Sequence, residues 1–221
     1  MGIQLSMTTN LTPHFNVRTT GGFFNYSTDF TASGIGADAK LNMHSVGTSL
    51  DIYPFHLGFR ISPGVLFYNG NQLSASANVA GGTSFTLNDE TYYSANANPA
   101  TGATPVNGNA LLSLHTSSPA FTITTGWGNH LQRKGHWSFP FELGAAFTGA
   151  PSLNVNLGGW ACYDQAQTLC TDITSPTDPI AQEIRTNLAA QVTKWTKDLE
   201  PLKTYPIASF GVAYSFGLRN K

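Results

Sequence analysis

Alternation of apolar and polar residues is strongest between residues 136 and 148. In this stretch every second residue is apolar, and the residues between these apolar positions are small or polar and include Glu142. Side chains on a strand alternate between two faces, so this stretch predicts a β-strand with one aromatic face and one small, polar face. In a water-soluble sheet the apolar face points inward, whereas in an outer-membrane barrel it points at lipid. The apolar positions are Trp137, Phe139, Phe141, Leu143, Ala145 and Phe147.

Six further stretches alternate in the same way, which predicts seven strands in total. In the third of them the apolar phase changes faces near His44 and Ser45, which predicts either a β-bulge or an interruption of that strand. Leu153, Val155 and Leu157 alternate in the same way and offer a continuation of the strand at 136–148. The other predicted strands are residues 3–9, 14–26, 40–53, 57–67, 110–127 and 206–216.

Two stretches read as long loops, residues 70–108 and 150–203. The first is polar and contains one small hairpin that turns at Asn88 and Asp89. The second contains a helix, because Asp178 is a suitable N-cap and Pro179 suits the first helical position. We expect its apolar stripe to pack on the rim of the strands, with a partner-binding helix as the alternative. The stripe is Ile180, Ile184, Leu188, Val192, Trp195 and Leu199.

Short and long connections alternate along the chain. The short ones lie near residues 12–13, 54–55 and 132–135, and the Gly-rich turn at 32–36 and the two long loops lie between them. Outer-membrane barrels have short periplasmic turns and longer outer loops. The pattern therefore predicts a single domain over residues 1–221, an all-β, antiparallel, up-and-down transmembrane β-barrel with one helix in a long loop.

Composition agrees with a barrel but does not require one. Only 10% of the residues are charged and the mean hydropathy is −0.12, because Gly, Ser, Thr and Asn replace charged residues. A secreted β-sandwich would have a similar composition. The net charge is −1 and no basic run occurs, so nucleic-acid binding has little support. No apolar run approaches the roughly 20 residues of a transmembrane helix.

The two cysteines, Cys162 and Cys170, close a short polar stretch, CYDQAQTLC. Such a pair predicts a disulfide formed in an oxidising compartment. Two free thiols are the alternative, and a metal site would need further ligands that are not near in sequence.

The first residues, MGIQLSMTTN, lack the basic and long apolar regions of a secretory signal. Seven strands are also an odd number, whereas single-chain outer-membrane barrels usually have an even number. If the short turns are periplasmic, the first strand runs toward the periplasm. We therefore expect an eight-stranded barrel whose first strand and signal peptide precede residue 1, unless the protein is soluble.

Three stretches resemble small bacterial outer-membrane β-barrel proteins of OmpA-like or OmpX-like architecture: LTPHFNVRTTGGFF, LDIYPFHLGFRISPGVLFYNGN and LKTYPIASFGVAYSF. The last resembles the C-terminal strand that the barrel-assembly machinery reads, with Tyr214 and Phe216 as its aromatic signature. Five residues follow Phe216, whereas such families usually end at the aromatic residue. The resemblance implies outer-membrane lipid and the assembly machinery as partners. It identifies neither a loop partner nor a transported solute.

Four charged side chains are expected on the lumen face: Arg18, Lys40, Arg60 and Glu142, with Asp51 near a strand end. Buried charges must pair, so we expect Glu142 to pair with Arg18, Arg60 or both. The functional interpretation is an ion path or gate, and the structural one is a salt-bridge core that fills a narrow barrel.

Catalytic chemistry has weak support. The six histidines lie mostly near strand ends, and neither HExxH nor G-x-S-x-G occurs. His44 with Ser45, or His115 with Ser117, could imitate the sites of outer-membrane lipid hydrolases. The sequence therefore predicts a non-enzymatic barrel without cofactor or metal, with a structural or interaction role or a narrow pore. A soluble lipocalin-like barrel and a lipid-modifying barrel enzyme are the alternatives.

Overall fold

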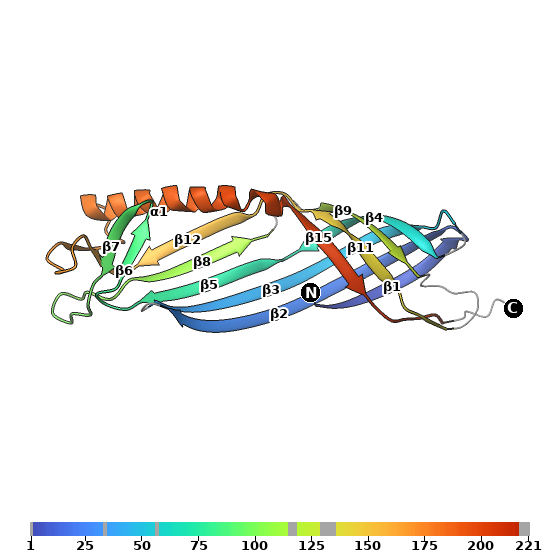
Figure 1. The fold of residues 1–221 in the computed structure, drawn as a ribbon, viewed down its shortest axis with the longest axis horizontal. Helices are drawn as coiled ribbons and strands as arrows, with labels where there is room; N and C mark the ends of the chain where they lie inside the picture. The colour runs from blue at the N-terminus through green and yellow to red at the C-terminus, as the bar shows by residue number, and fades with distance from the viewer. Residues whose placement is uncertain (1, 33–34, 56–57, 115–118, 129–135, 217–221) are drawn as a thin grey trace.

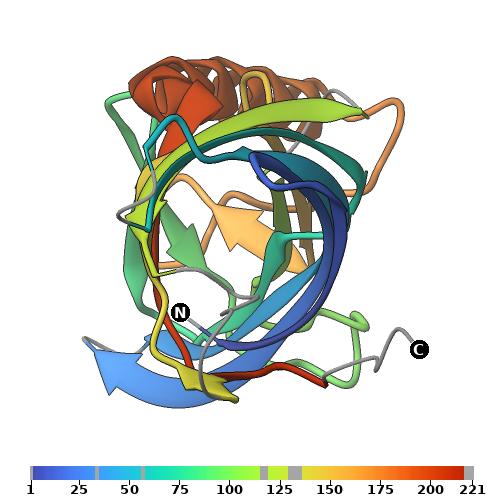
Figure 2. The same ribbon diagram turned by 90° about the vertical axis from the view of Figure 1, so that its right-hand side faces the viewer.

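One long antiparallel sheet dominates the computed structural model, which describes residues 2–32, 35–55, 58–114, 119–128 and 136–216. The sheet curls about the long axis of the molecule and, seen end-on, forms a ring-like wall (Figures 1 and 2). One long helix lies along one side of it (Figure 1). Among the described residues, no helix is both long and apolar enough to cross a membrane.

The first three strands confirm the predicted hairpins and are longer than expected. They are β1 (Ile3–Thr12), β2 (Phe15–Ala32) and β3 (Ile35–Ile52). β2 and β3 pair without interruption from Phe15 opposite Ile52 to Ala32 opposite Ile35. β1 covers only the first half of β2 and ends with Ile3 opposite Phe23.

The remaining strands lie end to end in two halves of the sheet. In one half, β3 pairs with β4, and β9, β11 and β15 follow in order; in the other half, β3 pairs with β5, and β8 and β12 follow. We call the half that contains β4, β9, β11 and β15 the lower half, and the half that contains β5, β8 and β12 the upper half. The bounds are β4 (Phe59–Asn69), β5 (Gln72–Val79), β8 (Asn107–Ser113), β9 (Ala120–Trp127), β11 (Phe141–Phe147), β12 (Ser152–Gly158) and β15 (Thr204–Phe210).

Both predicted long loops contain strands of the main sheet. β5 lies inside residues 70–108, where Ser, Ala and Asn replace the aromatic residues that marked the other strands. β12 lies inside residues 150–203 and continues the path of β11, as Leu153, Val155 and Leu157 suggested. The predicted strand at 110–127 consists of two, β8 and β9; between them, residues 115–118 lie outside the described residues.

The change of phase near His44 is not a bulge in β3, because β3 pairs with β2 in one continuous register. The register shift lies in the pairing of β3 with β4, where Val46 pairs with Tyr68 and Gly47 pairs with Leu66. Instead, the polarity of the two faces reverses along the sheet. In the lower half the apolar Val46 and Leu50 share the outer face, whereas in the upper half Leu41 and Met43 lie on the inner face.

Aromatic residues bound the outer face of the lower half at both ends of most strands. Phe15 and Phe23 are eight residues apart, a span of roughly 26 Å along a strand. This agrees with the apolar band, about 25 Å tall and flanked by aromatic girdles, of outer-membrane barrels. The exposed aromatic residues at the ends of the band include Phe15, Phe23, Phe67, Phe121, Trp127, Phe141, Phe147 and Phe210.

The upper half has a conventional core. The helix α1 (Pro179–Asp198) confirms the predicted start, because the Asp178 side chain accepts hydrogen bonds from the Ile180 and Ala181 amides. It packs against the inner face of β12 and a small four-stranded sheet, whereas Trp195, expected in the buried stripe, remains 41% exposed. The buried core residues are Val79, Leu87, Tyr92, Val106, Ala161, Ile173, Ile184 and Leu188.

The small sheet contains the predicted hairpin, β6 (Ser84–Leu87) and β7 (Glu90–Ser94). Its turn residues Asn88 and Asp89 have φ of 50° and 69°, as a tight hairpin turn requires. The sheet is completed by β13 (Trp160–Cys162) and β14 (Cys170–Asp172). The short elements elsewhere are the 3-10 helix η1 (Glu200–Lys203) and the paired strands β10 (Trp137–Ser138) and β16 (Ala213–Tyr214).

Candidate functional site: an ion-pair belt in the lumen

Four charged side chains meet inside the lower half of the sheet: Arg18 on β2, Asp51 on β3, Arg60 on β4 and Glu142 on β11. Each lies at an inward position of its strand, and each is less than 10% exposed. We call these four residues the ion-pair belt.

Glu142 is the centre of the belt. Its Oε2 atom lies 2.8 Å from Nη2 of Arg18 and 2.7 Å from Nη2 of Arg60, so one carboxylate oxygen serves both guanidinium groups. Arg18 also donates to Asp51, with Nε 3.1 Å from Oδ2 and Nη2 3.1 Å from Oδ1. Arg60 donates its Nη1 hydrogen to the carbonyl oxygen of Gly128 at 2.7 Å. Both pairings expected for Glu142 are therefore present.

The Arg18–Glu142 pair crosses the interior of the curled sheet. In the order of strands, β3, β4 and β9 separate β2 from β11. A contact between side chains of these two strands therefore spans the lumen as a chord rather than following the wall. The pair holds the two sides of the curled sheet together.

A glycine provides the space that the Arg60 side chain needs. Gly126 on β9 lies directly opposite Arg60, and a Cβ atom at this position would lie 3.2 Å from the guanidinium carbon. Thr124, the next inward residue on β9, donates to the Ser62 carbonyl oxygen. The small Gly126 on the neighbouring strand thus leaves room for the long Arg60 side chain in the interior.

Charge is balanced within the belt, since two arginines meet two carboxylates. Burial of an unpaired charge costs several kcal/mol, whereas charges with good geometry and additional hydrogen bonds are tolerated. Asp51 is fully buried, and sequence reasoning placed it only near a strand end. The feature that could have identified it is the β2–β3 pairing, which places Asp51 opposite Asn16, the inward-facing residue next to Arg18 on β2.

Lys40 does not belong to the belt, which corrects the sequence prediction. It lies on the outer face of the upper half and is exposed. The prediction assumed that Leu41 and Met43 faced outward, as the apolar residues of the lower half do. Because the polarity of the faces reverses, these two residues face inward and Lys40 faces solvent.

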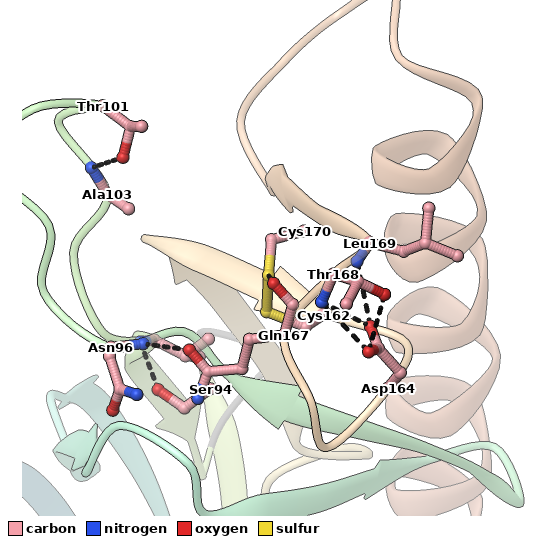
Figure 3. Close-up of a disulfide and its surroundings, with 11 residues drawn as sticks. Ser94, Asn96, Thr101, Ala103, Cys162, Asp164, Gln167, Thr168, Leu169 and Cys170 are labelled. Atoms are coloured by element: carbon pink, nitrogen blue, oxygen red, sulfur yellow. Dashed lines mark hydrogen bonds between the residues drawn. A yellow bond between two sulfur atoms is a disulfide. The ribbon is translucent and has the colours of Figure 1, made fainter.

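The predicted disulfide between Cys162 and Cys170 is confirmed and joins β13 to β14 (Figure 3). The loop that it closes contacts a second loop, because Gln167 Oε1 accepts a hydrogen bond from the Asn96 amide at 2.9 Å. Inside the closed loop, the Asp164 carboxylate accepts from the amides of Thr168 and Leu169 and from the Thr168 hydroxyl (Figure 3). The end of the upper half that carries these two loops is therefore held together by a disulfide and by hydrogen bonds.

The hydrogen bonds from the Thr168 and Leu169 amides hold the pKa of the Asp164 carboxyl below its ordinary value. A depressed carboxyl pKa stabilises the folded loop above the unfolded pKa, near 3.9, and this contribution is lost as pH falls through the folded value. We expect the NMR shifts of the Thr168 and Leu169 amides to titrate with a midpoint below 3.9, and not to titrate in Asp164→Asn. A midpoint at or above 3.9 would contradict this role.

Tyr214 and Phe216 lie in an exposed aromatic cluster at the lower end. The Tyr214 ring lies 5.0 Å from the rings of both Trp137 and Phe216, measured between ring centroids. Ala213 and Tyr214 form β16, which pairs with Trp137 and Ser138 of β10. The cluster lies beyond the lower aromatic boundary of the band, since β16 follows Phe210.

His44 and Ser45, one of the two pairs that could imitate a hydrolase site, do not form one. His44 and Ser45 are neighbours on β3 and point to opposite faces, and His44 contacts Asn25 Oδ1 at 3.0 Å. His115 and Ser117 lie outside the described residues. In the part of the chain that the structure describes, no three His, Cys, Asp or Glu side chains are grouped to hold a metal ion.

The apolar outer band, polar lumen and antiparallel up-and-down strands define a transmembrane β-barrel of the outer-membrane class. No protein-family model and no curated protein matches the sequence. Two solved structures share the fold. Acinetobacter baumannii CarO is 17% identical with a TM-score of 0.54, over 96% of this chain and 95% of that one; A. baumannii CarO2 is 17% identical with a TM-score of 0.53, over 96% of both chains.

Proposed function

We propose that this protein is an integral, non-enzymatic β-barrel of the bacterial outer membrane with a structural or interaction role. The observation that carries the proposal is the reversal of face polarity along β3. An outward apolar face suits the lower half to lipid, and an outward polar face suits the upper half to water. The lower half would anchor the protein, and the disulfide-stapled end of the upper half would present a surface to partners outside the cell.

The lumen of the proposed barrel is closed to solutes. The charge-balanced belt of Arg18, Asp51, Arg60 and Glu142 lies across the interior of the lower half, where three of its residues also line a cavity of about 800 Å³. An ion path would favour an excess of one sign of charge, as in the charged rings of selective pores. The balanced belt therefore supports a plug.

Planar-bilayer recording tests the plug. We expect no stepwise conductance from the wild-type protein, and measurable steps from the charge-neutral double variant Arg18→Ala/Glu142→Ala, because removal of both side chains opens the lumen. Asp38→Ala/Lys40→Ala, which removes one charge of each sign from the outer face, is the matched control and should remain closed. Steps of equal size in the wild type would contradict the plug and favour a narrow pore.

An eighth strand between β1 and β15 would complete the barrel. Six antiparallel steps separate these edges, so β1 and β15 run in the same direction and cannot pair with each other antiparallel. A strand of opposite direction would pair with both. We propose that it precedes residue 1, together with the signal peptide, and that the assembly machinery reads Tyr214 and Phe216.

The lipocalin-like alternative predicts the opposite orientation of β11. In that reading Phe141, Leu143 and Phe147 point inward, but they are exposed, whereas Glu142 is buried. The two similar structures are CarO proteins, which supports an outer-membrane barrel but not the OmpA-like or OmpX-like family specifically. A hydrolase assay with purified protein tests the enzymatic alternative, and lipid hydrolysis abolished by Ser45→Ala would overturn the non-enzymatic role.

A further inference from the structure

The second half of β2 has a free edge in the upper half of the sheet. Residues Phe24–Ala32 pair with β3 on one side, and the described residues place no strand on the other side. Tyr26 and Phe30 lie on the inner face of this segment and are 57% and 55% exposed. We call Phe24–Ala32 the free edge.

A long edge with aromatic side chains is unusual in an isolated protein, because unpaired amides and carbonyls are a template for another strand. Aromatic cross-strand pairs would add stability to such a pairing. The free edge therefore fits an extended segment that carries apolar side chains on its inner face.

The register of β1 indicates which segment this is. β1 pairs with β2 on the same side as the free edge. Followed toward the N-terminus, β1 runs toward the free edge and ends with Ile3 opposite Phe23. Gly2 continues this path: a Cβ atom at Gly2 would lie 2.8 Å from the Phe24 Cβ atom. Residues that precede Gly2 are thus directed along Phe24–Ala32.

We propose that the segment immediately before Gly2 extends β1 along the free edge. This inference rests on the proposed function, in which chain before residue 1 contributes to the barrel. The eight positions Asn25–Ala32 require eight residues before Gly2, Met1 among them. The residues opposite Tyr26 and Phe30 are apolar and their neighbours are polar, because the upper half has its apolar face inside.

A second copy of the protein does not fit this edge. Two copies in one membrane share an orientation, so their β2 strands both run toward the same side. Two β2 edges could then meet only in parallel, whereas β1 approaches β2 antiparallel and in an established register.

Residue-resolved amide hydrogen exchange on the mature, full-length protein in micelles tests the proposal. Along Phe24–Ala32, alternate amides point to β3 and to the free edge, so the β3-facing set is an internal control. We expect both sets to exchange at least about 100-fold more slowly than unstructured amides. Exchange of the edge-facing set at unstructured rates, with the β3-facing set protected, would overturn the proposal.

The N-terminus of the mature protein, determined by mass spectrometry, gives the second readout. At least seven residues before Met1 support the proposal; a mature chain that begins at Met1 overturns it together with the eighth strand proposed above, so amide exchange is the readout that separates the two. Slow exchange throughout Phe15–Phe23, where β2 lies between β1 and β3, would show that the lower half is intact. Failure at the free edge alone would therefore leave the membrane barrel standing.

Discussion

Glu142→Gln should lower the free energy of unfolding by about 3 kcal/mol, because two buried arginines lose the carboxylate that they share. Arg18 would keep the Asp51 carboxylate, whereas Arg60 would keep the neutral Gly128 carbonyl in place of a charged partner. Urea titration of the protein in detergent micelles, followed by tryptophan fluorescence, measures the change.

Glu90→Gln is the matched control, since it makes the same chemical change at an exposed position in the β6–β7 hairpin. We expect it to change stability by less than about 0.5 kcal/mol. Equal stability of the Glu142→Gln variant and the wild type would show that the belt does not hold the sheet together. A loss in Glu142→Gln that Arg18→Gln and Arg60→Gln do not share would also contradict the described geometry.

Ile123→Asp should impair membrane insertion far more than Thr122→Asp. The two residues are neighbours on β9, but Ile123 is 50% exposed on the outer apolar band and Thr122 lines the polar interior. A charge on the lipid face near the middle of the band costs on the order of 2 kcal/mol, whereas lumen positions tolerate polar groups.

This cost of about 2 kcal/mol for Ile123→Asp corresponds to about a thirtyfold change in the ratio of folded to unfolded protein. It can be measured as the fraction of heat-modifiable, folded protein after refolding into lipid vesicles. Similar yields for both aspartate variants would contradict the orientation of β9, and a lower yield for Thr122→Asp would support an apolar interior.

Sequence alternation predicted most of the lower half because its strands face lipid on one side and a polar lumen on the other. Each of these strands therefore carries a strong period of two, with aromatic residues near the boundaries of the band. The same alternation placed Arg18, Arg60 and Glu142 on one face. It could not show that one carboxylate oxygen serves both arginines, because that depends on how the sheet curls.

The upper half was harder to predict because the environment of each face changes there. Leu41 and Met43 follow the same period of two as Val46 and Leu50, but they face the interior of a water-exposed region. Sequence alone does not mark where the membrane ends, so Lys40 was assigned to the lumen. β5 was missed because its small side chains show little contrast between the two faces.

The pairing of Asp51 with Arg18 could not be predicted from the sequence, because it depends on how the strands are arranged in space. The residue lies near the end of β3, where a carboxylate is ordinarily solvated. Its burial follows from the β2–β3 register, which places it one inward step from Arg18. The helix and disulfide were predictable because the Asp178 cap and the spacing of the two cysteines are local signals.

Spin labels placed one at a time along β3, from Ala37 to Ile52, test the central claim most directly. Collision with dissolved oxygen reports lipid, and collision with a water-soluble nickel complex reports water. We predict high oxygen accessibility at Val46, Thr48 and Leu50 in lipid vesicles, and high nickel accessibility at Asp38, Lys40 and Asn42. Nickel accessibility at all six of these outward positions would show that no part of the sheet faces lipid and would contradict the membrane barrel.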